Sequence, residues 1–301
     1  MTGSALPGPA LPGSAPPAAR DLGTVLLTGA SGRLGRAVHA ALARLDDVEV
    51  VAVVSPRAAA QHPDAIALDL ADHAALAALV TARRPDTVLH LGAMVGAACQ
   101  ADPLAAIAVN VGSTRSIVDA LAEHPDARIV LASTVALYGD EGDAPFSESA
   151  PLVGQSAYAR TKRAAEEALE SGAVESVALR IANLWGPGFD DSLVARLQTT
   201  TASSPATVRG PAVFVRDYVH VDDVVAAVLA AATRPLPARH LVVNVGTGVA
   251  TTTQQLIALL ERHATVHAEV GEGSPTWSVV DPTLMHAALG VRARSVDELL
   301  G

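Results

Sequence analysis

The chain has 301 residues, of which 50% are hydrophobic and only 3% aromatic. Its 21 Lys and Arg residues against 31 Asp and Glu give a formal net charge of −10, which opposes binding to polyanions and excludes nucleic acid as an expected partner. No apolar run reaches the roughly 18 residues of a membrane span, so we expect no membrane association. The single Cys99 excludes an internal disulfide or thiolate metal site, so we predict a buried cysteine, no bound metal and a cytoplasmic protein.

Residues 1–20 are rich in Pro, Ala and Gly and are predicted to be a disordered tail. Beyond them, short aliphatic runs alternate with amphipathic stretches such as 33–45 and 156–171. The runs lie at 24–28, 48–55, 87–92, 128–133, 175–182 and 240–246. This alternation is typical of βαβ units and predicts an α/β fold, a doubly wound parallel sheet of the Rossmann type, with ligands at the carboxyl ends of the strands.

The regular alternation weakens after about residue 182, where a segment rich in Thr, Ser and Pro begins. We therefore predict a dinucleotide-binding domain at 21–182, with its sheet completed by about 221–263. Residues 183–220 and 264–301 are assigned to a smaller C-terminal lobe that binds substrate. A helix is expected near Thr251, because Thr251 and Gln254 have the spacing of a capping box.

Three glycines follow the first aliphatic run with the spacing G-x-x-G-x-x-G and lead into an amphipathic helix. Glycine permits a sharp turn, a close approach of a pyrophosphate to the backbone, and tight packing of the helix on the sheet. A tight strand-to-helix turn without a ligand is the alternative. The residues assigned to dinucleotide binding here are Gly29, Ser31, Gly32, Arg33, Leu34 and Gly35.

The end of the second run bears on the choice of dinucleotide. An acidic residue there would select NAD, but the run ends without one, and Ser55 and Arg57 together with Arg33 are placed to hold a 2′-phosphate. NADP is therefore the first choice and NAD the second, unless both arginines are simply solvated. Asp69 and Leu70 are assigned to the adenine side, with a helix cap as the alternative for Asp69, and Leu91, Gly92 and Ala93 complete the predicted cofactor contacts.

Tyr158 and Lys162 are four residues apart in a stretch with helical periodicity, so their side chains share one helix face. A nearby ammonium favours a phenolate, so we expect Lys162 to lower the pKa of Tyr158 and to make it an acid or base near neutral pH. The fourth strand is expected to end in Ser133 and Thr134, which places hydroxyls at the carboxyl edge of the sheet.

From about Thr24 to Leu300 the sequence resembles the extended short-chain dehydrogenases/reductases, within them the sugar-nucleotide epimerase/dehydratase group. The resemblance rests on seven motifs in order, namely TGASGRLG (28–35), HLGAMVG (90–96), ASTVALYG (132–139), YARTK (158–162), RIANLWGPG (180–188), RDYVHVDD (216–223) and NVGTG (244–248).

The resemblance implies a role for each matching residue. Thr134 would orient the substrate oxygen, Tyr158 would transfer its proton, and Lys162 would bind the nicotinamide ribose. Ser133, Asn183 and Arg216 would contact substrate, although Arg216 could instead pair with Asp217 or Asp222. Asn110 is expected to be a buried structural amide. The resemblance also implies a homodimer.

Two departures from the family pattern concern the substrate. The segment between Gly188 and Arg216 is shorter than usual in the family, and no arginine precedes Asp281-Pro282. Trp277 could stack on a base, but packing in the core is favoured, and Arg292 or Arg294 could replace the missing charge.

The function favoured by the sequence is reduction of a keto group on a nucleotide-linked sugar, with NADP as cofactor and Tyr158 as proton donor. A dehydratase is disfavoured because Val135 and Ala136 follow Thr134 where the family's dehydratases carry an Asp-Glu pair. The alternatives are an NAD-dependent nucleotide-sugar epimerase, a reductase of a non-sugar carbonyl, and a dinucleotide-binding regulator with a vestigial catalytic face.

Overall fold

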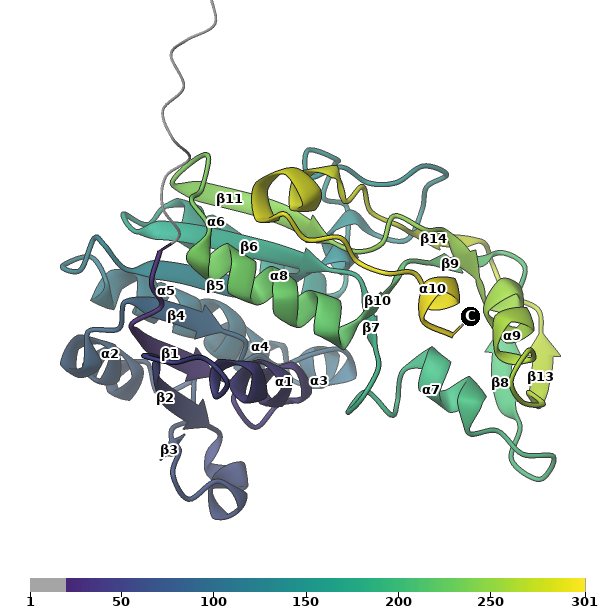
Figure 1. Cartoon of the computed structure of the whole chain (residues 1–301), viewed down its shortest axis with the longest axis horizontal. Helices are drawn as coiled ribbons and strands as arrows, with labels where there is room; N and C mark the ends of the chain where they lie inside the picture. Colours follow the sequence, from purple (N-terminus) through teal and green to yellow (C-terminus); the bar gives the residue numbers. More distant parts are fainter. Residues whose placement is uncertain (1–19, 301) are drawn as a thin grey trace, which may run out of the picture.

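A computed structural model describes residues 20–300, so all but the last residue of the predicted disordered tail lies outside the described part. Seven parallel strands form the central sheet in the order β11-β6-β5-β4-β1-β2-β3 (Figure 1). These strands are β1 (Thr24–Thr28), β2 (Glu49–Val54), β3 (Ile66–Ala67), β4 (Thr87–His90), β5 (Arg128–Thr134), β6 (Glu175–Ile181) and β11 (His240–Val245). The predicted doubly wound parallel sheet is confirmed. Only β3 has no predicted counterpart, because two residues make no recognisable run.

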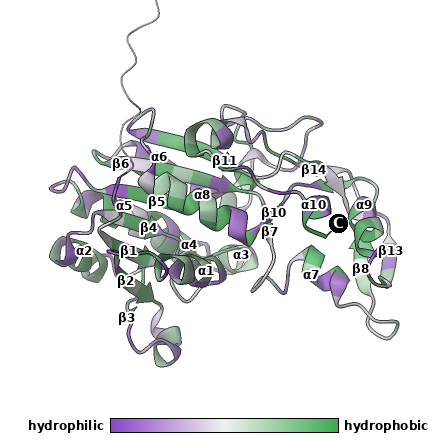
Figure 2. Ribbon diagram, viewed as in Figure 1, coloured by the Kyte–Doolittle hydropathy of each residue, from purple (hydrophilic) through white to green (hydrophobic). Residues whose placement is uncertain are grey.

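Helices cover both faces of the sheet, and this explains why its strands are apolar on both sides. One face carries α1 (Arg33–Leu42) and α8 (Val221–Thr233), which pack on Val25 and Leu27. The other carries α2 (His73–Arg83), α5 (Ser113–Ala120) and α6 (Ala157–Glu170), which pack with Leu26. The strands in the middle of the sheet are correspondingly hydrophobic (Figure 2).

Short helices connect the strands and the long helices. They are η1 (Pro56–Gln61), α3 (Ala97–Ala101), α4 (Pro103–Ile107), η2 (Ala108–Gly112) and η3 (Val135–Tyr138). Cys99 on α3 is completely buried beside Ala106 and Ala157, as predicted. Asn110 on η2 is also buried, where its amide bonds the backbone of Met94 and the Thr161 hydroxyl, so its predicted structural role is confirmed.

A second group of elements lies beyond the carboxyl ends of the main strands (Figure 1). Its strands are β7 (Asn183–Trp185), β8 (Ala206–Arg209), β9 (Phe214–Arg216), β10 (Tyr218–His220), β12 (Thr251–Thr252), β13 (Ala268–Gly271) and β14 (Thr276–Ser278). Its helices are α7 (Leu193–Gln198), α9 (Thr253–Leu260) and α10 (Val296–Leu300), while η4 (Met285–Leu289) packs back on α8. Trp185, Tyr218 and Leu256 belong to a hydrophobic core of this group's own.

The capping box of α9 is shifted by one residue from its predicted position. Thr252 accepts a hydrogen bond from the Gln255 amide, and the Gln255 side chain accepts one from the Thr252 amide. Thr251 is instead buried in β12, because it pairs with Arg216 of β9. None of the helices in residues 20–300 is long and apolar enough to cross a membrane.

Candidate active site

The glycine motif forms the turn between β1 and α1. Gly29 has a φ of +70°, and a Cβ atom there would lie 2.6 Å from the Gly92 backbone. A Cβ at Gly35 would collide with the Gly29 carbonyl oxygen, whereas one at Gly32 would meet only that oxygen, at 3.1 Å. α1 starts directly after Gly32 with no side-chain cap, so its first amides remain available to an anion. These features fit the pyrophosphate of a dinucleotide.

A buried chain of hydrogen bonds supports this turn from below. The Gly92 amide donates to Thr28 Oγ1, Thr28 Oγ1 lies 2.7 Å from His90 Nδ1, and His90 Nε2 lies 3.0 Å from Ser113 Oγ. Because the Ser113 hydroxyl donates to the Val109 carbonyl, it accepts from Nε2, and Nδ1 accepts from Thr28. His90 is therefore neutral, and burial lowers its pKa to about 3.

The two edge loops that were predicted to bind the adenosine half both carry exposed polar side chains. Ser55 and Arg57 are exposed at the end of β2, and no acidic residue lies between them. Asp69 is also exposed and accepts a hydrogen bond from the Ala71 amide. The cap of α2 is Asp72, so the alternative assignment of Asp69 as a helix cap is wrong. Leu70 packs directly under Gly92.

A cavity of about 470 Å³ opens at the carboxyl ends of the strands, within the range of small-molecule sites. It brings together predicted residues from distant parts of the chain, namely Gly29, Gly32, Arg33, Leu34, Gly35, Leu91, Ala93, Ser133, Thr134, Tyr158, Lys162 and Asn183. Ser31, Ser55, Arg57, Asp69, Leu70, Gly92 and Arg216 do not line it. Thus both the glycine turn and the Tyr158–Lys162 face of α6 border one space.

Tyr158 lies on the wall of this cavity, which Thr134 also lines. Burial raises the pKa of Tyr158 to about 12, and the Thr134 hydroxyl offsets this only in part. The expectation that Lys162 lowers the pKa of Tyr158 is therefore wrong for this structure: desolvation of the phenolate dominates. Tyr158 is therefore protonated at neutral pH. Lys162 is 2% exposed, and burial lowers its own pKa to about 8.

The three residues predicted to touch substrate lie in different settings. Asn183 lines the cavity, and its side-chain amide donates a hydrogen bond to the Asp217 carbonyl. Ser133 borders the cavity, but it is buried and its hydroxyl donates to Glu166, so that hydroxyl is already engaged. Arg216 lies outside the cavity, donates to Thr276 and covers the Phe214 ring.

The alternative pairing of Arg216 with Asp217 or Asp222 is wrong. Asp217 is completely buried and accepts hydrogen bonds from Thr247 and Gly248. Asp222 lies 3.4 Å from His220. Both carboxylates therefore have other neighbours.

The two C-terminal arginines that could replace the missing charge are each paired with a carboxylate. Arg292 pairs with Glu298 and Arg294 with Asp223, each at under 3 Å. The expected core packing of Trp277 is wrong as well. Its indole is partly exposed, donates to the Ala144 carbonyl, and lines a separate cavity beside Asp140.

Sequence reasoning missed Phe189 and Asp191 as site residues, although both follow the recognised motif that ends at Gly188. In the structure, Asp191 forms an ion pair with Arg33, whose guanidinium also lies over the Phe189 ring. The Arg33 side chain is therefore directed into the main cavity and toward the second group of elements. The prediction of a shared 2′-phosphate site required Arg33 to lie with Ser55 and Arg57. Arg33 lines the main cavity, and neither of those residues does.

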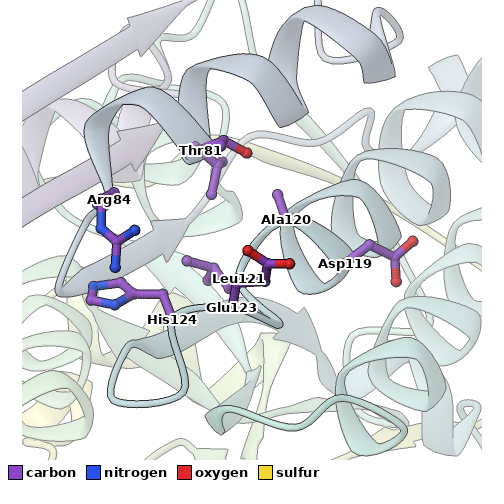
Figure 3. Close-up of a pocket in the computed structure, with 8 residues that line it drawn as sticks. Thr81, Arg84, Asp119, Ala120, Leu121, Glu123 and His124 are labelled. Atoms are coloured by element: carbon purple, nitrogen blue, oxygen red, sulfur yellow. The ribbon is translucent and has the colours of Figure 1, made fainter.

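Another cavity, of about 340 Å³, lies where α2 and α5 end (Figure 3). Arg84, Asp119, Glu123 and His124 are among its lining residues. In βαβ units the helices run opposite to the strands, so this cavity is at the amino ends of the strands. It contains none of the predicted site residues.

Known proteins that resemble this chain include enzymes that act on nucleotide-linked sugars. The sequence matches the model of the NAD dependent epimerase/dehydratase family over residues 25–246. The dTDP-6-deoxy-L-talose 4-dehydrogenase (NAD(P)(+)) of Kitasatospora kifunensis is 32% identical, covering 88% of this chain and 89% of that protein. A UDP-glucose 4-epimerase of Rhizobium meliloti (strain 1021) is 30% identical, covering 74% and 76%. The solved structure of MoeE5 in complex with UDP-glucuronic acid and NAD has a TM-score of 0.79 and 27% identity, over 92% of this chain and 96% of that one.

Proposed function

We propose, since this chain belongs to the NAD dependent epimerase/dehydratase family, that it reduces a keto group on a nucleotide-linked sugar with NADPH. The observation that carries the proposal is Tyr158, which lines the main cavity together with Thr134 and is protonated at neutral pH. A reductase needs a proton donor at this place. The similarity to a 4-dehydrogenase that uses NAD(P) supports the same reaction type.

The chain's own residues would hold the cofactor along the carboxyl edge of the sheet. The amides after Gly32 would bind the pyrophosphate, and Leu91 and Ala93 would line its path. When bound, the nicotinamide supplies the hydride, which is chemistry that belongs to the cofactor. Lys162 would hold the nicotinamide ribose beside Tyr158.

In the reducing direction Thr134 would orient the substrate oxygen, and Tyr158 would donate its proton to that oxygen as the carbon accepts the hydride. Asn183, on β7 of the second group of elements, would contact the substrate. For Arg216 we keep the proposal of a contact with the diphosphate. Its guanidinium already lies beside Thr276 and Phe214, so it would have to turn toward the ligand.

The preference for NADP rests on Ser55 and Arg57. Both are exposed at the end of β2, where an acidic side chain would repel a 2′-phosphate and an arginine attracts one. The pairing of Arg33 with Asp191 leaves Arg57 as the cation on which this preference depends.

The proposal is tested by mixing the protein with NADPH and a panel of nucleotide-linked 4-keto-6-deoxy sugars and following nicotinamide absorbance. We expect turnover with at least one sugar, and a loss of at least ~100-fold in kcat in Tyr158→Phe. Fluorescence of bound NADPH serves as the control for an intact cofactor site. No turnover with any sugar would refute the proposed reaction.

A second candidate is an epimerase of a nucleotide sugar with retained NAD. It is supported by the similarity to a UDP-glucose 4-epimerase and by MoeE5, whose structure holds NAD. Acid release of the cofactor from freshly purified protein separates the two, because an epimerase of this type retains NAD and a reductase exchanges NADP.

We also propose that the chain forms a homodimer in the cytoplasm. Leu104 on α4 is 79% exposed and Ile107 is 51% exposed, an apolar surface that a second copy would cover. The lone, buried Cys99 suits a reducing compartment. Sedimentation of the protein with and without Leu104→Glu tests the dimer, which the added charge should dissociate.

A further inference from the structure

Lys162 is the only lysine in the 301 residues, and every other residue in the count of 21 Lys and Arg is arginine. An arginine stays charged in any protein environment, whereas a buried lysine can lose its proton near neutral pH. The charge of Lys162 therefore depends on the groups around it, since its side chain is 2% exposed.

Lys162 interacts electrostatically with Cys99 on α3, Glu166 on α6 and His90 at the end of β4. Tyr158 lies four residues before it on α6. Burial raises the pKa of the Tyr158 phenol and of the Cys99 thiol and lowers that of the His90 imidazole, so all three are neutral at pH 7. Glu166 is the remaining group; it lies one helical turn after Lys162 on the same face of α6 and forms an ion pair with Arg180.

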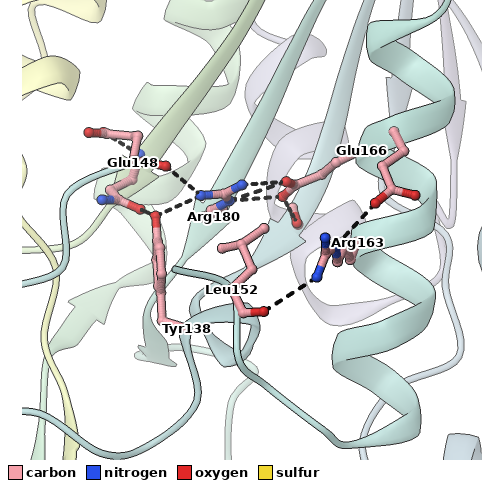
Figure 4. A network of polar contacts seen from close by, with 9 residues as sticks. Tyr138, Glu148, Leu152, Arg163, Glu166 and Arg180 are labelled. Atoms are coloured by element: carbon pink, nitrogen blue, oxygen red, sulfur yellow. Dashed lines mark hydrogen bonds and ion pairs between the residues drawn. The ribbon is translucent and has the colours of Figure 1, made fainter. Parts of the chain in front are cut away.

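Glu166 is buried, and a network of polar side chains holds it in one orientation (Figure 4). Arg180 on β6 donates to both of its oxygens, at 2.7–3.2 Å, and Ser133 donates to Oε1. Arg180 also donates to the Tyr138 hydroxyl, which in turn donates to Asn244. Ser133 immediately precedes Thr134, which lines the main cavity with Tyr158, so this network is anchored beside the site at the end of β5.

We propose that Glu166 is a positioning residue of the catalytic site, whose carboxylate keeps the Lys162 ammonium charged while its bond to Ser133 fixes the end of β5. Arg180 forms an ion pair with the same carboxylate, so its positive charge offsets part of the attraction between Glu166 and Lys162. The inference deepens the proposed function, because it concerns the lysine assigned to the nicotinamide ribose.

The two partners have opposite effects on Lys162. Glu166→Gln removes a negative charge and leaves the Arg180 guanidinium, so the pKa of Lys162 falls from about 8 by ~1 unit or more. Arg180→Gln removes the positive charge, so the pKa of Lys162 rises. If the two substitutions only disturbed the packing of the site, the pKa of Lys162 would not move in opposite directions in Glu166→Gln and Arg180→Gln.

The single lysine makes the measurement direct. Protein grown with lysine labelled with ¹³C at Cε gives one side-chain NMR signal, and its pH titration reports Lys162 without cofactor or substrate. We expect a midpoint near 8 in the unaltered protein, a lower one in Glu166→Gln and a higher one in Arg180→Gln. Unchanged midpoints, or shifts of the same sign in both variants, would overturn the proposal.

Arg128 provides a matched control. It lies at the other end of β5, is 2% exposed and pairs with Glu175 of β6 at 2.7 Å, so it is another buried arginine between the same two strands. Arg128→Gln should lower the stability of the protein and leave the Lys162 midpoint in place. A shift in this control equal to that in Arg180→Gln would also overturn the proposal.

Glu166→Gln leaves a buried guanidinium without its partner, and such a variant can fail to fold. The double variant Glu166→Gln/Arg180→Gln removes both charges, and its Lys162 midpoint should lie below that of Arg180→Gln alone. Because the titration needs no substrate, it is independent of the proposed reaction. Absence of turnover with every sugar of the panel would refute the proposed reaction, whereas the titration alone decides the role of Glu166.

Discussion

Acid should destabilise this protein through His90, the buried imidazole beneath the glycine turn. His90 is 1% exposed, and both of its ring nitrogens have partners, the hydroxyls of Thr28 and Ser113. The Ser113 hydroxyl already donates to the Val109 carbonyl, and Thr28 donates to Nδ1. Protonation would place a second donor opposite the Thr28 hydroxyl and a charge in an apolar core.

The direction of the pH effect follows from the two pKa values. The folded protein holds the His90 pKa at about 3, below the ordinary value of 6.5, so the neutral form is favoured by folding. Stability from this group is complete above pH 6.5 and declines as pH falls toward 3, because the unfolded chain binds the proton first. At about 1.36 kcal/mol per unit, the loss between pH 7 and pH 4.5 is ~2.5 kcal/mol.

Other histidines and carboxylates titrate over the same range, so the effect of His90 is isolated by comparison with His90→Gln. A glutamine amide can accept from Thr28 and donate to Ser113, but it does not take up a proton. Urea unfolding at pH 7 and pH 4.5 gives the free energy of unfolding of both proteins. The unaltered protein should lose ~2.5 kcal/mol more than His90→Gln over this interval. Equal losses in the two proteins would refute the reasoning.

Three further predictions concern the glycine turn, the cofactor and the second group of elements. Gly35→Ala should lower the free energy of unfolding by ~1–3 kcal/mol and weaken dinucleotide binding, because its Cβ collides with the Gly29 carbonyl, while Gly32→Ala should cost less stability; equal losses by urea unfolding would contradict this. Arg57→Ala should weaken NADPH binding ~10-fold by fluorescence titration and leave NADH binding unchanged, and a parallel loss for both would exclude a 2′-phosphate contact. Asp217→Asn should cost ~2 kcal/mol, because an amide cannot accept from both Thr247 and Gly248, whereas a similar loss in the exposed Asp190→Asn would refute this.

Local sequence alone was sufficient to predict the elements that form the proposed cofactor half of the site. The spacing of Gly29, Gly32 and Gly35 after an apolar run predicts the turn, and residues 158 and 162 share a helix face whatever surrounds them. Each of the six aliphatic runs matches a strand of the central sheet to within two residues at either end, because strands buried on both faces must be apolar.

The tertiary structure alone decided how these side chains are paired and charged. Arg33 meets Asp191 and Ser133 meets Glu166, partners that lie 158 and 33 residues away along the chain. The pKa of Tyr158 rises although a lysine lies one helical turn away, because desolvation depends on all the atoms packed around the phenol. Periodicity and glycine spacing are local properties, whereas ion pairs and burial depend on where distant segments meet. The sequence therefore determined the sheet and the turn, and the packing of distant segments determined the burial of Tyr158 and Lys162 and the groups that surround them.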